Sequence, residues 1–276
     1  MTRFSRKLGP LYDEGMKKKH FWVEFTSDEL AQAVRKETVA ILPLAAVEQH
    51  GPHLPLGVDL YLVESFIQAG LKNAQAQDQV LVLPTLQMGI SLEHADFVGT
   101  LDLDAQLMRA ACLEMASAVA RAGISRLLLF NSHGGNSGLM DIVGRQIRQE
   151  TGLIVFHSNW YDLAEPEFMV KQFGQDELRF GVHAGDVETS LMMAIRPDLV
   201  GETRAHHAST AQAKAQQFAI LGDGRSAKQS WMARDYSPTG AMGDARKSTP
   251  DKGARLLEHV GLRLIELTRE IARFQV

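Results

Sequence analysis

Four separate segments of this 276-residue chain carry side chains that bind metal ions: residues 48–59, 93–94, 131–136 and 183–188. Their histidines and acids form a mixed set of imidazole and carboxylate ligands. Such a set suits zinc first, or manganese or iron, and when it is rich in carboxylates it can hold two ions side by side. Two ions that clamp one water form a hydrolytic centre. The sequence therefore predicts a hydrolase with two divalent metal ions per chain.

The first segment contains the densest group of candidate ligands. Glu48 and His50 are two residues apart, so on an extended chain their side chains point to the same side. Asp59 follows within reach, and a carboxylate between two ions can bridge them. The alternative is that Asp59 only caps the helix expected after it. Beside Glu48 and His50, we favour a role as a metal ligand.

The third segment places His133 directly after an apolar run and before an expected helix. The glycines that follow, Gly134 and Gly135, allow a ligand to approach the backbone closely. A phosphate held by the helix N-terminus is the competing interpretation. Because the segment has no Gly-Lys-Ser/Thr sequence, we favour a metal ligand followed by a tight turn.

The fourth segment places His183 and Glu188 on either side of Gly185. Asp186 is expected to cap a helix over 187–195, with Glu188 in its first turn. Acids are common at helix N-termini, which is the plainer explanation of Glu188. His183 could be a ligand, a partner of a ligand, or a general acid and base, because histidine is the side chain best suited to proton transfer near neutral pH.

Further residues are candidates for a substrate pocket. Glu93 and His94 follow the second expected strand and so face the same edge of the sheet. Trp160 and Arg179 could also line the pocket, although core packing is the alternative for Trp160.

The elements that position these residues alternate along the chain. Unbroken apolar runs predict strands at 39–44, 80–83, 126–130 and 153–156, and amphipathic patterns predict helices at 26–36, 59–71, 104–121, 139–150, 205–221 and 251–274. A capping box of Thr26 and Glu29 marks the first helix. Wholly apolar strands between helices indicate an α/β fold whose mostly parallel sheet is covered on both faces. Ligands bind at the carboxyl ends of such strands, where these candidates lie.

The composition is that of a globular protein, with 45% hydrophobic and 22% charged residues. We expect one domain over 1–276, with an N-terminal extension at 1–21 and a long loop at 222–248. The formal charge of −4 argues against a nucleic-acid partner, and no apolar run is long enough to span a bilayer. The basic residues 1–19 lack the apolar core of a signal peptide, and Cys112 is a single cysteine, so a cytoplasmic protein without disulfides is expected.

Taken together, these motifs resemble the creatininase (creatinine amidohydrolase) family. Residues 42–59 resemble its first metal motif almost throughout, and residues 131–136, 183–190 and 237–244 match in order and spacing. The resemblance implies a three-layer α/β/α sandwich, a two-metal amidohydrolase site and a homohexamer. It also implies that Glu48 and His133 hold one metal, that His50 holds the other, that Asp59 bridges them, and that His183 takes part in proton transfer.

This chain also departs from the family pattern. Creatininase has Tyr and a metal-binding Glu where this chain has Gly134 and Gly135, so we expect Glu188 to supply the missing carboxylate. Arg179 lies near the place of a tryptophan that packs on creatinine, and it would suit an anionic or hydroxylated substrate.

The expected reaction is hydrolysis of a small, cyclic amide by a metal-bound hydroxide. Deformylation of a formylamino-pyrimidine, peptide cleavage and hydrolysis of a keto-inositol ring remain open within the family. Outside it, the alternatives are a non-catalytic metal-binding protein and a nucleotide-binding protein.

Overall fold

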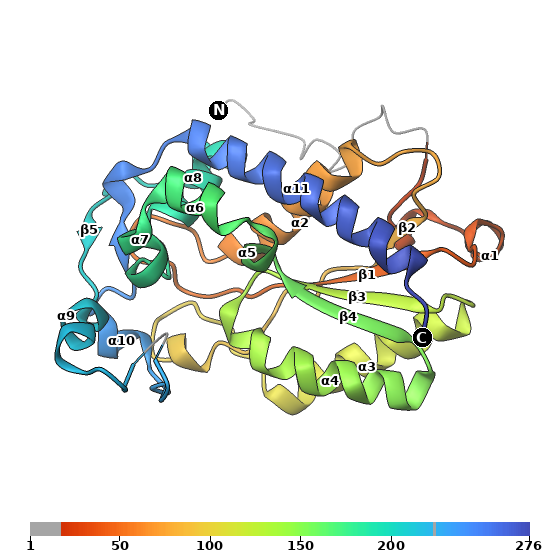
Figure 1. Cartoon of the computed structure of the whole chain (residues 1–276), viewed down its shortest axis with the longest axis horizontal. Helices are drawn as coiled ribbons and strands as arrows, with labels where there is room; N and C mark the ends of the chain where they lie inside the picture. The colour runs from red at the N-terminus through yellow and green to blue at the C-terminus, as the bar shows by residue number, and fades with distance from the viewer. Residues whose placement is uncertain (1–17, 223–224) are drawn as a thin grey trace, which may run out of the picture.

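The computed structural model describes residues 18–222 and 225–276, and a four-stranded parallel sheet lies at its centre (Figure 1). The strands are β1 (Val39–Leu44), β2 (Val80–Val82), β3 (Arg126–Asn131) and β4 (Ile154–Asn159), in the order β2-β1-β3-β4. Every residue of β1 and β3 is buried, as their apolar runs predict. Leu44 pairs with Asn131, so the loops after these two strands start side by side at one edge.

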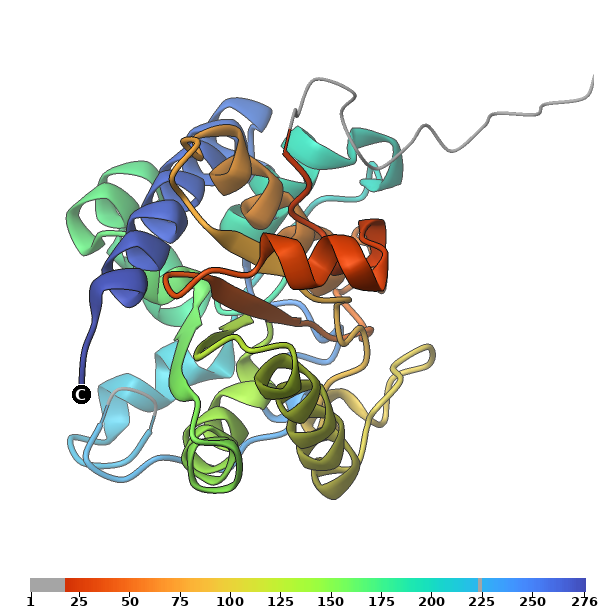
Figure 2. The same cartoon turned by 90° about the vertical axis from the view of Figure 1, so that its right-hand side faces the viewer.

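Helices cover both faces of the sheet, which confirms the three-layer α/β/α architecture (Figures 1 and 2). On one face, α3 (Ala105–Arg121) packs beside α4 (Ser137–Thr151). On the other, α11 (Pro250–Arg273) packs on α2 (Val58–Lys72) and on α8 (Asp186–Ile195). The side chains of β1 alternate between the two layers, because Ile41 belongs to the α2–α11 core and Leu42 to the α3–α4 core.

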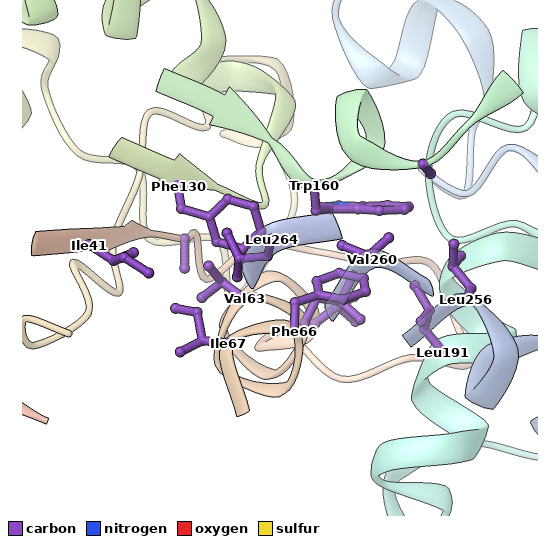
Figure 3. Packing of buried hydrophobic residues seen from close by; sticks show 14 of the residues in the cluster. Ile41, Val63, Phe66, Ile67, Phe130, Trp160, Leu191, Leu256, Val260 and Leu264 are labelled. Atoms are coloured by element: carbon purple, nitrogen blue, oxygen red, sulfur yellow. The ribbon is translucent and has the colours of Figure 1, made fainter. Parts of the chain in front are cut away.

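The core beneath α11 contains the buried aromatic side chains Phe66, Phe130 and Trp160 (Figure 3). Trp160, the first residue of α5 (Trp160–Leu163), stacks on Phe66 with their ring centroids 5.2 Å apart. Leu264 of α11 belongs to the same cluster. Burying side chains of this size stabilises the fold by about 1.5–3 kcal/mol each. The structure therefore places Trp160 in the hydrophobic core, which is the alternative that the sequence left open for it.

The starts of the helices show which N-cap residues were predicted correctly from the sequence. Thr26 and Glu29 form the expected capping box at α1 (Ser27–Ala33). The two other caps proposed from the sequence are wrong, because the N-cap residues of α2 and α8 are Gly57 and Gly185. Asp59 and Asp186 lie inside the first helical turn and cap nothing, which leaves the Asp59 carboxylate free to face the sheet edge.

The segment from 160 to 248 is more structured than its sequence pattern suggests. It contains α5, α6 (Pro166–Phe173), α7 (Gln175–Phe180), α8, β5 (His206–His207), α9 (Thr210–Gln217), α10 (Ala233–Tyr236) and β6 (Gly243–Asp244). The helix predicted over 205–221 is limited to α9, and the loop predicted over 222–248 includes α10 and β6, which pairs antiparallel with β5. No helix in the described ranges is long and apolar enough to cross a membrane.

Candidate metal centre

The predicted metal ligands meet at the carboxyl-terminal edge of the sheet. Glu48 and His50 follow β1, His133 follows β3, Asp59 starts α2 and Glu188 starts α8. The potential ligand atoms form three groups, each within 4.8 Å: Glu48, Asp59 and His133; His50, Asp59 and Glu188; and Glu48, His50 and His183. Asp59 is shared by the first two groups, as a bridging carboxylate would be.

The distances between these atoms are close to those of a coordination shell. His133 Nδ1 lies 3.3 Å from Glu48 Oε1 and 3.6 Å from Asp59 Oδ2. His50 Nε2 lies 3.9 Å from Glu188 Oε2. Ligand atoms of a tetrahedral zinc ion are separated by roughly 3.3–3.6 Å, given bonds of roughly 2.0–2.2 Å. Little movement would bring these side chains onto an ion.

Three polar atoms of this cluster are buried without a hydrogen-bond partner: Glu48 Oε2, His50 Nε2 and Asp59 Oδ2. Buried polar atoms are almost always paired, and an unpaired carboxylate oxygen is especially costly. All three residues belong to the candidate ligand groups. Divalent cations would satisfy the three atoms together, so the residues present fit a metal centre.

Backbone carbonyl groups fix the orientation of the imidazole rings. The Nδ1–H of His50 donates to the Glu48 carbonyl at 3.1 Å, and the Nε2–H of His133 donates to the Ile90 carbonyl at 2.7 Å. These bonds leave His50 Nε2 and His133 Nδ1 directed at the carboxylates. Metal-binding histidines are usually held in this way, with the second ring nitrogen hydrogen-bonded.

The ionisation of the cluster points to a missing positive charge. Burial, followed by the charge of Glu48, raises the pKa of Asp59 well above its usual value. Burial, followed by the proximity of His183, lowers the pKa of His50 well below its usual value, so this ring is neutral. Burial would also lower the pKa of His133, but Glu48 and Asp59 outweigh burial and raise it to about 10. A proton on His133 thus offsets the carboxylates, a role that a cation can take.

Gln49 organises two further histidines, and sequence reasoning missed this residue. Its backbone carbonyl accepts the Nε2–H of His183 at 2.6 Å, and its side-chain amide donates to His94 Nδ1 at 2.7 Å. The Gly51 amide donates to Gln49 Oε1 at 2.9 Å, which sets the direction of the side chain. The only signal for Gln49 in the sequence was its position between Glu48 and His50, because an amide is not itself a typical metal ligand.

Gly135 offers no carboxylate and has little room for a side chain. A Cβ atom at this position would lie 2.1 Å from the Ile90 carbonyl oxygen and 2.8 Å from Glu93 Oε1. Glu188 reaches the centre from α8, where its Oε2 accepts the Ala184 amide at 2.6 Å. Ala184 has a positive φ of 55°, unusual for a residue other than glycine. The backbone is thus bent at Ala184 beside this hydrogen bond.

Glu93 and His94, two of the predicted pocket residues, border the centre. Glu93 Oε1 lies 3.9 Å from His133 Nε2, and His94 Nε2 lies 3.5 Å from Glu48 Oε1. Burial, then His183, lowers the pKa of His94 to about 3. Trp231, which the sequence did not single out, meets the His94 ring edge-on at 6.5 Å. Neither Glu93 nor His94 belongs to a candidate ligand group among the described residues.

The other predicted residues lie apart from the ligands. Arg179 lies on α7, with its guanidinium 5.0 Å from the ring of Phe180, and lines a cavity outside the metal centre. Gly134 has open space where a side chain would point. His157, just beyond the end of the strand predicted over 153–156, lies inside β4 with its Nε2 3.7 Å from Asp141 Oδ1 of α4.

Comparison with characterised proteins agrees with this geometry. The chain is 30% identical over 221 residues to the mycofactocin precursor peptide peptidase of Mycobacterium ulcerans, covering 78% of each protein. It is 32% identical over 200 residues to the creatinine amidohydrolase of Pseudomonas putida, covering 67% of this chain and 75% of that protein. These relatives are named for different substrates.

The similar solved structures include creatininases described as manganese and zinc forms. A manganese creatininase superposes with a TM-score of 0.74 at 25% identity, covering 92% of this chain and 98% of the other. A creatininase variant described as the Zn–Zn type superposes with a TM-score of 0.73 over the same shares. Residues 23–268 match the family described as creatinine amidohydrolase. The fold, the buried ligand cluster and this match together show that the chain is a hydrolase of the creatininase family.

Proposed function

We propose that this protein is a metal-dependent hydrolase that cleaves a small, cyclic amide. The observation that carries the proposal is the trio of buried, unpaired atoms in Glu48, His50 and Asp59. Glu48, Asp59 and His133 would hold one divalent ion, and His50, Asp59 and Glu188 would hold the second. Zinc is our first choice because the set combines imidazole and carboxylate ligands, and manganese or iron would also suit it.

The bound ions would supply an activated water and polarise the carbonyl group of the amide. The protein must then move a proton from that water to the leaving nitrogen. His183 is placed for this role, because its Nε2–H is bound to the Gln49 carbonyl and its Nδ1 faces Glu48 Oε1 at 3.8 Å. The His183 ring also lies against His50, with centroids 4.2 Å apart. His183 therefore borders the ligands with a free lone pair that can accept and return a proton.

Cleavage of a peptide bond is the second candidate, and it rests on the peptidase relative at 30% identity. The chemistry at the centre would be the same, since both substrates present an amide carbonyl and a leaving nitrogen. The two candidate substrates differ in size, because the site must bind more of a peptide than of a small cyclic amide beyond the reacting bond.

A substrate panel tests the proposal. The zinc- or manganese-loaded protein is assayed on creatinine and other cyclic amides, on a formylamino-pyrimidine, on a keto-inositol and on short peptides. We expect turnover of a cyclic amide, abolished by a chelator, and a kcat lowered by about 10²–10⁴-fold in His183→Gln with metal content unchanged. Cleavage of peptides alone would favour the second candidate. Tight metal binding without turnover of any compound would contradict both and indicate a non-catalytic metal-binding protein.

A further inference from the structure

One carboxylate outside the ligand groups ties three elements together. Glu177 lies on α7, where its Oε1 accepts the Asp186 amide at 2.6 Å and its Oε2 accepts the Asp244 amide at 3.0 Å. Asp186 is the first residue of α8, and Asp244 is the second residue of β6. Both oxygens of the Glu177 carboxylate are therefore bound by backbone N–H groups of other elements.

The space around this carboxylate has no room for further side chains. Gly181, Gly185 and Gly243 surround it, and a Cβ atom at any of the three would come within 3.0 Å of Glu177 Oε1. Real Cβ atoms almost never lie so close to a neighbouring atom. Because protein interiors are close-packed, a side chain at any of these glycines would displace the carboxylate. The three segments can close around Glu177 only because each of them presents a glycine.

The hydrogen bond to Asp186 caps α8 from a different helix. The first N–H groups of a helix have no partner within it, and the side chain of the N-cap residue usually accepts one of them. The N-cap residue of α8 is Gly185, which forms no side-chain cap. Glu177 supplies the missing acceptor, and its negative charge lies at the positive end of the helix dipole. The start of α8 is therefore held by a residue of α7.

The first turn of α8 also carries a candidate metal ligand. Glu188, two residues after Asp186, completes the ligand group with His50 and Asp59. Glu177 belongs to no ligand group among the described residues. Any effect of Glu177 on a metal ion must therefore pass through the backbone of α8.

The hydrogen bond to Asp244 holds a second segment beside the metal centre. Met242, two residues before Asp244, donates its amide to the His183 carbonyl at 2.7 Å. The Nε2–H of His183 is in turn bound to the Gln49 carbonyl at 2.6 Å. The same carboxylate thus binds the start of α8 and the segment that pairs with His183.

We propose that Glu177 is a positioning residue for the second metal ion. By holding the first N–H of α8 beside β6, it keeps the Glu188 carboxylate within reach of that ion. The inference rests on the proposed function, because it requires the two-ion centre. If the Glu177 carboxylate is lost, the start of α8 loses its acceptor, and the N-cap residue Gly185 has no side chain to replace it.

A zinc titration of the metal-free protein against a chromophoric chelator tests this role, because it measures the affinity of each ion without turnover. In Glu177→Gln one acceptor oxygen is replaced by an amide group, which cannot accept a backbone N–H. We expect the second ion to bind about 10–100-fold more weakly, as is typical when a residue that orients a ligand is lost, and the first ion to keep its affinity. Glu177→Asp keeps the charge but is one methylene shorter, so it should weaken the same ion.

Two controls separate positioning from other effects. Asp176→Asn removes the same charge from the neighbouring, exposed position of α7 and should bind both ions as the wild type does. The variant Glu188→Gln already lacks the carboxylate that Glu177 is proposed to position. Adding Glu177→Gln to it should leave the affinity of the remaining ion unchanged. Urea unfolding of the metal-free proteins shows that each variant is folded, and Glu177→Asp decides the question if Glu177→Gln does not fold.

The possible results distinguish this inference from the proposed function. Two ions bound with wild-type affinity by folded Glu177→Gln would overturn the inference alone, and a lower stability without a change in affinity would show a purely structural role. Equal weakening of both ions would also overturn it, because the effect would not be specific to the ion beside α8. A wild-type protein that binds fewer than two ions would contradict the proposed centre, and the inference with it.

Discussion

We propose that Glu188 supplies the second carboxylate of the metal centre, since Gly135 has no side chain and little room for one. Its carboxylate completes the group formed with His50 and Asp59, although it comes from a helix about fifty residues further along the chain. The candidate second ion therefore depends on a ligand whose position is set by α8 and by the bent backbone at Ala184.

Replacing Glu188 should remove one metal site. Glu188→Gln keeps an acceptor for the Ala184 amide but loses a charged ligand, so we expect the metal content to fall by about one equivalent per chain. Elemental analysis after dialysis measures this. Glu93→Gln is the matched control, since Glu93 lies beside His133 but in no ligand group of the described residues, and it should retain both ions. An unchanged metal content in Glu188→Gln would show that the ligand was assigned wrongly.

Gly135 should be intolerant of any side chain. In Gly135→Ala the new methyl group would overlap the Ile90 carbonyl, and we expect a loss of about 1–3 kcal/mol in the free energy of unfolding. Gly138, three residues along, faces open space at the start of α4. Gly138→Ala should be neutral or stabilising by up to about 1 kcal/mol. Urea unfolding of both variants in metal-free buffer compares them, and equal stabilities would contradict the close contact at Gly135.

At the scale of elements, the long helix α11 is tied to the sheet by one buried acid. Asp78, just before β2, is 7% exposed and accepts two hydrogen bonds from Arg269 at 3.0 and 2.8 Å. The Arg269 guanidinium lowers the pKa of Asp78 below its usual value. A lowered pKa means that the folded state binds this proton less readily than the unfolded chain does. The stabilisation is therefore present above the ordinary pKa, and it is lost as the pH falls through the folded value.

Asp78→Asn should lower the free energy of unfolding by about 1–2 kcal/mol at pH 7, since the Arg269 side chain is one-third exposed and screening weakens the pair. The difference from wild type should shrink as the pH falls below about 4, where the unfolded chain takes up this proton first, and it should vanish below the lowered pKa of the folded state. Chemical denaturation of both proteins between pH 3 and 7 measures this difference in the free energy of unfolding. Asp141→Asn breaks an exposed pair with Arg145 and should cost little at any pH. A difference for Asp78→Asn that stays constant with pH would refute the assignment.

The elements also show which parts of the fold can be predicted from sequence patterns. The strands β1 and β3 and the helices α3, α4 and α11 were predictable, because full burial requires apolar runs and amphipathic helices have a strong periodicity. The short helices between 160 and 180 were missed, since they are held by tertiary packing of single residues such as Trp160 on Phe66. In the site, Glu48, His50 and His133 stood out by residue type. Gln49 and Trp231 did not, because their roles come from contacts with His94 that only the fold creates.

At the scale of the whole molecule, apolar side chains remain exposed around the loop that carries Glu93. Leu92, Val98, Leu101 and Leu107 are 60%, 100%, 50% and 61% exposed. Apolar side chains in such a group commonly mark a contact between proteins. These exposed side chains support the proposal of a homo-oligomer, and the family resemblance alone implies that it is a hexamer.

The mass of the protein in solution tests this proposal. Light scattering on the metal-loaded protein should give a species of six 30.5 kDa chains. Val98→Asp should shift it toward smaller species, because a buried interface disfavours an unpaired charge. Ile142→Asp, at a 61% exposed position on α4, is the matched control for a charge placed on an apolar surface. A wild-type species of 30.5 kDa would contradict the assembly.

The central claim is that two divalent ions lie among Glu48, His50, Asp59, His133 and Glu188. Anomalous X-ray diffraction at the zinc edge, on crystals of the zinc-loaded protein, tests it directly. We expect two peaks about 3.5–4 Å apart, one on each side of the Asp59 carboxylate. Zinc bound elsewhere, or no anomalous peak beside Glu48 and His50, would contradict it.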